Sequence, residues 1–204
     1  MTRACAITRL AGLWRRLRRE RRAVTAVEFA VAAPVLLVLL LGIYDMGHTA
    51  YLGAVLHGAV QQAGRSDALE TSDTAAADAY VTRIVRGVAP GAKVTATRVS
   101  YYDFADVERS EAWNDNNNNG ICDKGESYTD ENKNGHWDED IGKSGNGGAN
   151  DVVLYTVKVT YKPVFSVPFT TLTDGERTMT ASAVKKNQPY ALQQKYGSAA
   201  GTCP

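Results

Sequence analysis

A block of arginines that runs directly into an apolar segment constrains this chain more than any other feature. Residues 15–22 hold six Arg, and the apolar segment covers the 16 residues from Phe29 to Tyr44. A helix needs about 20 apolar residues to cross a bilayer, so this span is long enough only when residues 23–28 are included. Glu28 then lies inside the span, where a charge costs about 2.5–3.5 kcal/mol even on a lenient scale. A carboxylate retained at that cost indicates that Glu28 has a function.

Charge is distributed unevenly between the two sides of this apolar segment. The first 22 residues carry eight Arg and one Glu, a net charge of +7, whereas the other 182 residues carry 15 Lys and Arg against 21 Asp and Glu, a net charge of −6. Arg-rich flanks stay in the cytoplasm, so we expect the N-terminus inside and the acidic body outside. An arginine block can also bind nucleic acid, but the adjacent apolar run favours its interpretation as the cytoplasmic flank of a membrane span. We therefore expect no nucleic-acid partner.

This N-terminal segment resembles that of the type IV pilin superfamily, and specifically that of the TadE-like pseudopilins of tight-adherence secretion systems. The family pattern is a basic leader, a glycine, four residues, a Glu with an aromatic, and then a hydrophobic helix. Glu28 and Phe29 match the acid and the aromatic. Ala23 stands where the family has glycine, and Val24 would be the first residue after cleavage. The resemblance implies that a prepilin peptidase removes residues 1–23.

The resemblance also implies a function and a set of partners. It implies a minor pseudopilin of a tight-adherence (Flp) pilus assembly system, of the type II/IV secretion class. The partners would be prepilin peptidase, other pilins and pseudopilins, and the inner-membrane assembly platform, with no small-molecule substrate. The single pass would lie in the bacterial inner membrane, with the N-terminus cytoplasmic and the head periplasmic or extracellular, free or in a pilus. Glu28 would neutralise the N-terminal ammonium of a neighbouring subunit.

Other interpretations stay open at the level of sequence. A cleaved secretory signal would have its apolar region end near Leu41, and a plain anchor would not be processed. The strongest alternative function is a membrane-tethered or secreted calcium-binding interaction domain unrelated to pilus assembly. An enzyme is not expected, because no Ser or Cys stands with His and Asp partners in a recognisable motif.

The remaining pattern predicts an α+β, pilin-like fold. Apolar and small residues continue at spacings of three and four beyond Tyr44, so one helix, membrane-spanning and then amphipathic, should extend to about Leu69. Ser72 or Asp73 should cap a second helix over residues 74–88. A small antiparallel sheet of three or four strands should pack on the long helix. The predicted strands are 94–102, 152–161 and 177–184, with a short edge piece at 165–172.

These elements divide the chain into four predicted parts. They are a basic cytoplasmic leader at 1–23, a transmembrane and amphipathic helix at 24–70, an exported α+β head at 71–187 with a calcium-loop insert at 111–150, and a weakly ordered tail at 188–204.

The insert contains two copies of the pattern D-x-N-x-N-G-x-x-D, fifteen residues apart. Calcium takes six to eight oxygen ligands from a flexible loop, supplied at alternate positions, and glycine permits the sharp turn in the middle. The first copy fills the whole twelve-residue calcium pattern. Its predicted ligands are Asp115, Asn117, Asn119, the carbonyl of Ile121, Asp123 and a bidentate Glu126.

The second copy lacks the final bidentate acid, because Ile141 occupies its twelfth position. Asp138 and Asp140 should compensate, in a site that is weaker or shares ligands with the first. Its predicted ligands are Asp130, Asn132, Asn134, the carbonyl of His136, Asp138 and Asp140. The loops resemble the isolated calcium loops of dockerins and thrombospondin type 3 repeats.

We therefore expect one or two calcium ions with a structural role. Without an ion, the like charges of the insert would repel one another. The alternative is a flexible polar loop that happens to be rich in Asn and Gly, but repetition in register argues against it.

Two of the three cysteines lie in the part that we expect to be exported. An oxidising compartment permits Cys122 and Cys203 to form a disulfide, which would pin the tail to the central loop. Two free thiols are the alternative.

Overall fold

The computed structural model consists of two compact units and describes residues 21–67, 73–164, 175–188 and 197–203. The first unit comprises Met1–His48 and Pro163–Asp174, and the second comprises Thr49–Lys162 and Gly175–Pro204. Several predicted features lie outside the described residues: most of the leader, the end of the long helix at 68–69, the break at 70–72, the edge piece at 165–172 and part of the tail.

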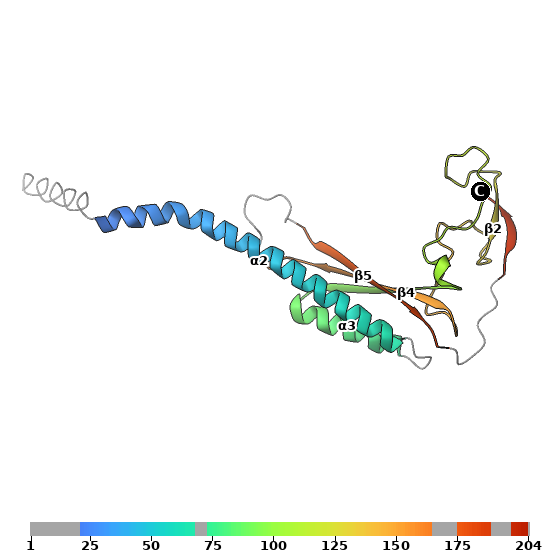
Figure 1. Cartoon of the computed structure of the whole chain (residues 1–204), viewed down its shortest axis with the longest axis horizontal. Helices are drawn as coiled ribbons and strands as arrows, with labels where there is room; N and C mark the ends of the chain where they lie inside the picture. Colours follow the sequence, from blue (N-terminus) through green and yellow to red (C-terminus); the bar gives the residue numbers. More distant parts are fainter. Residues whose placement is uncertain (1–20, 68–72, 165–174, 189–196, 204) are drawn as a thin grey trace, which may run out of the picture. The chain divides into compact units, whose positions relative to one another are not determined.

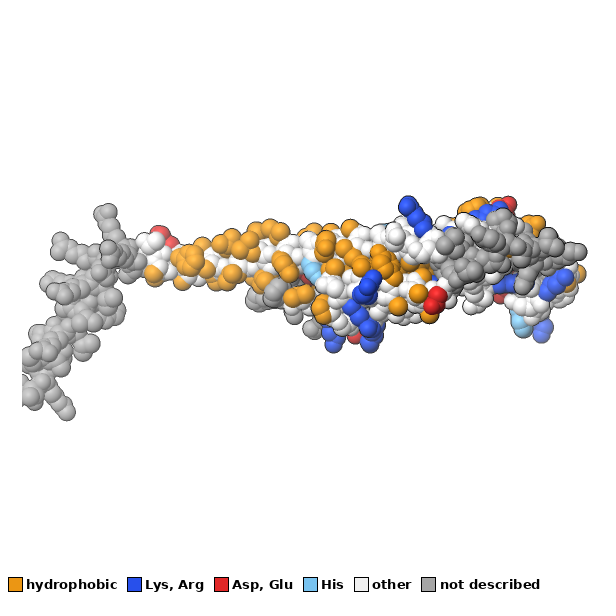
Figure 2. All heavy atoms as spheres, turned by 90° about the horizontal axis from the view of Figure 1, so that it is seen from below, with side chains coloured by type: hydrophobic (Ala, Val, Ile, Leu, Met, Phe, Trp, Pro, Cys, Tyr) orange, Lys and Arg blue, Asp and Glu red, His pale blue; other side chains and the backbone are white. Residues whose placement is uncertain are grey.

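The predicted long helix is confirmed as α2 (Arg21–Asp67), drawn in blue to teal in Figure 1. Over Val24–Ser66 it is long and apolar enough to cross a membrane, and it is the one such helix among the described residues. Figure 2 shows its apolar side chains along the first unit. Exposed examples are Val27, Phe29, Val31, Val35, Leu37 and Ile43. By length and composition, this part of α2 is a candidate membrane anchor.

The second helix, α3 (Thr74–Val88), has the bounds predicted from the sequence. Asp73 is its N-cap, and the Asp73 carboxylate accepts from the amides of Ala75 at 2.9 Å and Ala76 at 3.2 Å. A cap of this kind satisfies backbone donors that the first helical turn leaves without partners. Figure 1 shows α3 running back alongside the C-terminal half of α2.

A four-stranded antiparallel sheet forms the other layer of the second unit. Its strands are β1 (Lys93–Tyr101), β3 (Lys143–Ser144), β4 (Val152–Tyr161) and β5 (Arg177–Lys186), in the order β3-β1-β4-β5. The three predicted strands are confirmed as β1, β4 and β5. The fourth strand, β3, comes from the predicted insert and pairs with Val99 and Ser100 of β1. The α+β class and the long helix packed on a small antiparallel sheet are thus as predicted.

Both helices pack on one face of the sheet. Leu52, Leu56 and Val60 of α2 and Val81 and Val85 of α3 are fully buried. They meet the alternate residues Tyr155, Val157 and Val159 of β4. A β-carbon added at Gly64 of α2 would lie 3.3 Å from that of Ala183, so glycine permits the close approach of α2 to β5. This helix–sheet core holds the strand ends from which the insert projects.

The insert forms its own small structure beyond β1. Its strand β2 (Ser127–Asp130) pairs with β6 (Ala199–Thr202) of the C-terminal tail, and a short 3-10 helix, η1 (Phe104–Asp106), lies between β1 and the insert. The prediction of a weakly ordered tail is wrong for β6. The sequence of β6 has no alternation of apolar and polar residues that would predict a strand. It forms a strand because its backbone pairs with that of β2.

Candidate metal centre

The first calcium-type loop, residues 115–126, is closed by its own acids and amides. The Asp115 carboxylate accepts from the amide nitrogens of Asn119 at 3.2 Å and Gly120 at 2.8 Å. Asp123 Oδ2 accepts from Asn117 Nδ2 at 2.8 Å and Asn119 Nδ2 at 2.6 Å. The predicted residues at alternate positions therefore converge in one loop. Gly120 has φ of +78°, the left-handed region that favours glycine, as predicted for the central turn.

Glu126 closes this loop with both oxygens of its carboxylate. Oε1 accepts from the amide of Asn116 at 2.8 Å, and Oε2 accepts from the amide of Asp123 at 2.9 Å. Glu126 is 4% exposed. The structure thus brings the predicted twelfth-position acid to the second and ninth residues of its loop.

The second loop, residues 130–141, repeats the internal bonds of the first, fifteen residues later. The Asp130 carboxylate accepts from the amides of Asn134 at 3.2 Å and Gly135 at 2.9 Å. Asp138 Oδ2 accepts from Asn132 Nδ2 at 2.6 Å and also from Asn134. Gly135 has φ of +83°, matching Gly120. The repeat seen in the sequence is therefore also a repeat of conformation.

Of the remaining predicted ligands, Ile121 and His136 have partners within their loops, whereas the Asp140 carboxylate does not. Ile121 and His136, predicted to offer carbonyl oxygens, each donate a backbone N–H to the Asn two residues before them, at 2.8 and 2.7 Å. The Asp140 carboxylate has partners away from the loop: Oδ2 accepts from the Tyr101 hydroxyl at 2.8 Å, and Oδ1 accepts from the Gly142 amide at 3.0 Å. Asp140 is therefore engaged with the end of β1.

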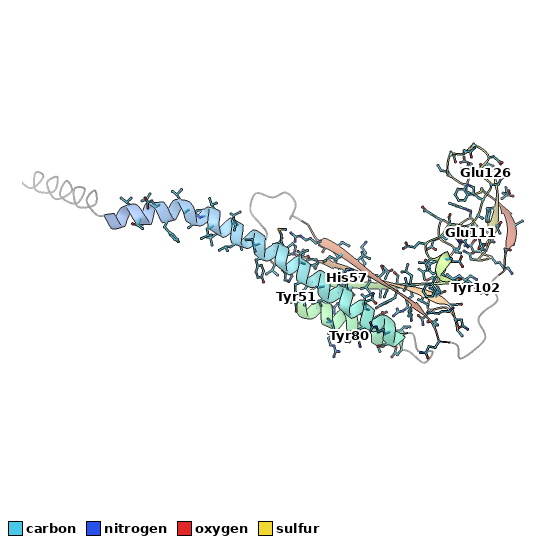
Figure 3. All side chains as sticks on the ribbon, in the orientation of Figure 1. Tyr51, His57, Tyr80, Tyr102, Glu111 and Glu126 are labelled. Carbon is cyan, nitrogen blue, oxygen red and sulfur yellow. A yellow bond between two sulfur atoms is a disulfide. The ribbon has the colours of Figure 1, made fainter. Side chains whose placement is uncertain are left out.

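A residue absent from the sequence prediction, Glu111, closes the second loop. Its Oε1 accepts from the amide of Glu131 at 2.7 Å, and its Oε2 accepts from the amide of Asp138 at 3.2 Å. Figure 3 labels Glu111 and Glu126 in the insert. A lone acid in a polar stretch gives no local signal of such a role, because Glu111 precedes the loop by nineteen residues.

Hydrogen bonds within the first loop favour the ionised form of Asp123. Hydrogen bonds from Asn117 and then Asn119 lower the pKa of Asp123. Burial, followed by the charges of Asp130, Glu111 and Asp138, raises the pKa of Tyr128 beside the second loop. Negative charge is therefore concentrated at the second loop, where it opposes ionisation of the neighbouring phenol.

An ion pair braces the second loop from outside. Arg109 contacts Glu131 at 2.7 Å and Asp106 at 2.9 Å. The hydrogen bond from Arg109, ahead of the opposing effect of burial, lowers the pKa of Glu131. Glu131 points out of the loop toward Arg109, so it is not one of the residues at ligand positions.

Oxygen donors from amides must complete any calcium site here. Within the described ranges, no three His, Cys, Asp or Glu side chains are grouped so as to hold a metal ion by themselves. Calcium loops draw on Asn and backbone carbonyls as well as carboxylates. The donor set of each loop fits calcium in kind: two Asp, two Asn, one backbone carbonyl position and a Glu that spans the loop ends.

The predicted disulfide is present between Cys122 and Cys203, with the two Cα atoms 5.8 Å apart. The amide of Cys203 also donates to the carbonyl of Glu126 at 2.7 Å. The bridge and this bond fix the end of β6 to the first loop. The prediction that a disulfide would pin the tail to the central loop is confirmed.

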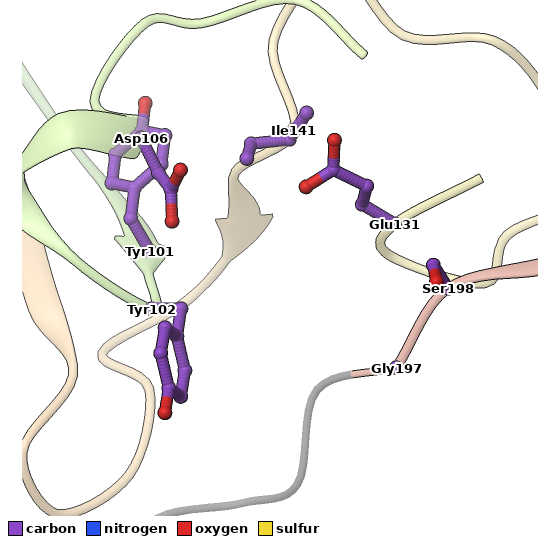
Figure 4. Close-up of a pocket in the computed structure, with 7 residues that line it drawn as sticks. All are labelled: Tyr101, Tyr102, Asp106, Glu131, Ile141, Gly197 and Ser198. Carbon is purple, nitrogen blue, oxygen red and sulfur yellow. The ribbon is translucent and has the colours of Figure 1, made fainter. Parts of the chain in front are cut away.

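A hollow of about 240 Å³ lies beside the second loop (Figure 4). Its lining consists of Tyr101, Tyr102, Asp106, Glu131, Ile141, Gly197 and Ser198. Both lining acids are ion-paired with Arg109. The single positive charge of Arg109 therefore offsets part of the negative charge of these two carboxylates.

The predicted processing residues lie together near the start of α2. Ala23, Val24, Glu28 and Phe29 are all helical, and the side chains of the last three are exposed. Their roles in cleavage stay predictions.

Comparisons with known proteins bear on this N-terminal helix. Neither the curated proteins nor the solved structures gave a significant match to the chain. A family model did match, over a region that begins at the predicted cleavage position and includes Glu28. Residues 23–65 match the model described as TadE-like protein, so the chain carries a TadE-like region along α2.

Proposed function

We propose that this chain is a minor pseudopilin-like component of a tight-adherence pilus assembly system, anchored by α2 and carrying a calcium-stabilised exported head. The observation that carries the proposal is the TadE-like match over residues 23–65. The match includes the exposed apolar part of α2, and over Val24–Ser66 this helix has the length and composition of a membrane span. The proposed role is structural rather than catalytic.

The proposed topology places residues 1–23 in the cytoplasm and the head outside the bacterial inner membrane. The Arg-rich flank supports this orientation, because positive flanks are retained inside. Prepilin peptidase would cut after Ala23, and the assembly platform would then pack α2 against other pilins. The exposed apolar side chains of α2, such as Val27, Val31 and Leu37, support such packing, because they offer an apolar surface to a neighbouring helix.

Recovery of the protein from membranes, followed by intact mass and N-terminal sequencing, tests the proposal. A mature chain that starts at Val24 and keeps α2 is the expected result. A start beyond Tyr44 would mean that the apolar helix is a discarded signal, and the chain would then be a secreted domain. An intact leader would contradict pilin-type processing and favour an anchored calcium-binding domain.

The calcium part of the proposal rests on the paired loops. In the first loop an ion would be held by Asp115, Asn117, Asn119, Asp123, Glu126 and the carbonyl of Ile121. The residues at the equivalent positions of the second loop would hold another ion. A bound cation would neutralise the acids that now meet only N–H groups of the loops. The role of the ion would be to stabilise the insert. Where a loop folds only around its ion, the free energy of metal binding also contributes to the free energy of folding.

Thermal unfolding of the full chain in detergent tests calcium binding. Calcium at about 100 times the dissociation constant should stabilise the folded head by about 2.7 kcal/mol relative to EGTA. Magnesium should do less, because it demands a smaller octahedral site. The double variant Asp115→Asn with Asp130→Asn should lose the calcium shift, whereas Asp103→Asn, at the cap of η1, should keep it. An equal calcium shift in both variants would contradict the assignment.

A further inference from the structure

The second loop lacks the acid that its spacing requires. Ile141 stands at the twelfth position, and its backbone amide donates to the Arg109 carbonyl at 2.9 Å. The Ile141 side chain packs with Tyr101 and Val152 instead of facing the loop. Asp140, the nearest acid in sequence, is hydrogen-bonded to Tyr101 and Gly142. Neither residue supplies the function that Glu126 has in the first loop.

Glu111 makes in the second loop the bonds that Glu126 makes in the first. Glu126 accepts from the amides of Asn116 and Asp123, and Glu111 accepts from the amides of Glu131 and Asp138. Each donor in the second pair lies fifteen residues after its counterpart in the first. The two carboxylates therefore occupy equivalent places, although one follows its loop and the other precedes it.

The backbone around Glu111 fixes it in this place. The Glu111 amide donates to the Asp138 carbonyl at 3.0 Å, and the Glu111 carbonyl accepts from Trp137 Nε1 at 3.1 Å. On the following residues, the Ala112 carbonyl accepts from Thr129 at 2.8 Å, which holds this segment beside β2. The side chain is thus held by a rigid element, as a ligand position requires.

Burial of Glu111 supports a cation at this place. Glu111 is 0% exposed, and Glu126 is 4% exposed. Neither takes part in the ion pairs found among the described residues. The Glu111 carboxylate accepts from the backbone amides of Glu131, Asn132 and Asp138, which offset part of the cost of burying its charge. Buried charges in proteins are ordinarily also paired with an opposite charge or bound to a metal. A divalent cation between Glu111 and the loop acids would provide that compensation.

We propose that Glu111, rather than Asp140, is the bidentate acid of a second calcium site formed with Asp130, Asn132, Asn134 and Asp138. This inference rests on the proposed calcium binding and adds to it the identity of the missing ligand. It also makes the two sites one unit, because β2 joins Glu126 of the first site to Asp130 of the second. A calcium site completed by an acid upstream of its loop escapes a search for the twelve-residue pattern.

Calcium counting on the full chain in detergent, by equilibrium dialysis with radioactive calcium, tests the proposal. Wild type should bind two ions. Glu111→Gln should weaken one of them about 10–100-fold or more and leave the other unchanged. Glu126→Gln should weaken the other ion, and Asp140→Asn should leave both. Retention of both ions by Glu111→Gln, or loss of one ion in Asp140→Asn, would overturn the assignment.

Two controls separate ligation from a structural role. In EGTA, the melting temperature of Glu111→Gln reports any damage to the fold, and the gain in melting temperature on adding calcium reports the site. If Glu111→Gln does not fold, Glu111→Asp keeps the charge with a shorter reach and should weaken only the second ion. Absence of calcium binding by wild type would instead refute the proposed calcium function itself. A single ion that survives in both Glu111 variants would overturn the second site alone.

Discussion

Cys203 is attached to the first loop twice, through its disulfide with Cys122 and through the 2.7 Å bond from its amide to the Glu126 carbonyl. The bridge closes 81 residues of sequence, which include β2, β4 and β5. It therefore restrains the unfolded chain strongly and also holds β6 beside the acid that closes the loop.

Replacement of Cys203 by Ser should destabilise the head by about 2–4 kcal/mol, the usual effect of removing a disulfide. The calcium affinity of the first loop should fall about tenfold, because the support of its closing acid is lost. Thermal unfolding and calcium titration of the full chain measure the two effects. Cys5→Ser is the matched control and should change neither. Unchanged stability in Cys203→Ser would mean that the bridge is not formed in the native protein.

The ion pair between Arg98 and Asp78 should matter more than the one between Lys93 and Glu176. Arg98 is 10% exposed at the side chain and contacts Asp78 at 2.8 Å. The Asp78 carboxylate also accepts from the Tyr155 hydroxyl at 2.8 Å. Asp78→Asn should cost about 1.5–3 kcal/mol, the range for a hydrogen bond to a charged group.

Glu176→Gln serves as the control for that variant. The Lys93–Glu176 pair is 3.7 Å long with side chains 77% and 44% exposed. Exposed pairs contribute about 0–1 kcal/mol. In denaturation curves Asp78→Asn should therefore lose more stability than Glu176→Gln, and equal losses would show that the buried pair contributes no more than the exposed one.

Acid should weaken the brace of the second loop. The pKa of Glu131 is lowered from its ordinary value of 4.5, chiefly by the hydrogen bond from Arg109. Its folded pKa is below its unfolded pKa, so its contribution is full above pH 4.5 and is lost as pH falls through the folded value. In buffer freed of calcium beforehand, the stability difference between wild type and Glu131→Gln should shrink below pH 4.5. In an Arg109→Met background this pH dependence should disappear, and its persistence would point to another partner.

Local signals were sufficient for the main elements of the head. Asp73 ahead of residues with helical spacing predicted α3, because a cap and an apolar face both act within a few residues. Alternation predicted β4, whose residues Tyr155, Val157 and Val159 are all fully buried. The disulfide was predicted because the expected topology places Cys122 and Cys203 in an oxidising compartment.

Elements that depend on distant partners were beyond local patterns. β3 has two residues and β6 has four, and neither carries an alternation that marks a strand. Likewise, no local pattern near Glu111 links it to residues 130–138, because it is long-range bonds, such as those from Thr129 to Ala112 and from Glu111 to Asp138, that bring it there. Asp140 was the natural choice by spacing, but spacing does not reveal the Tyr101 hydroxyl that holds its carboxylate.

The close contact between α2 and β5 gives a prediction about packing. The added β-carbon at Gly64 would lie 3.3 Å from Ala183, so Gly64→Val should push the helix from the sheet and cost about 1–3 kcal/mol. Gly58→Val is the control, because nothing lies within 4 Å of a β-carbon at Gly58. Thermal unfolding in detergent measures both, and equal effects would indicate a helix-propensity loss rather than a clash.

Ala23→Gly should increase processing if a prepilin peptidase recognises this chain. The substitution restores the residue that the resembled family has before the cut, and it leaves Val24, Glu28 and Phe29 unchanged. The fraction of chain that starts at Val24, measured by intact mass and N-terminal sequencing from membranes, should rise. Ala26→Gly places the same change in the same helix, where it has a similar propensity cost of about 1 kcal/mol, and should leave that fraction unchanged. An equal rise in both variants would reflect a looser helix, and no mature chain in either would refute cleavage at Val24.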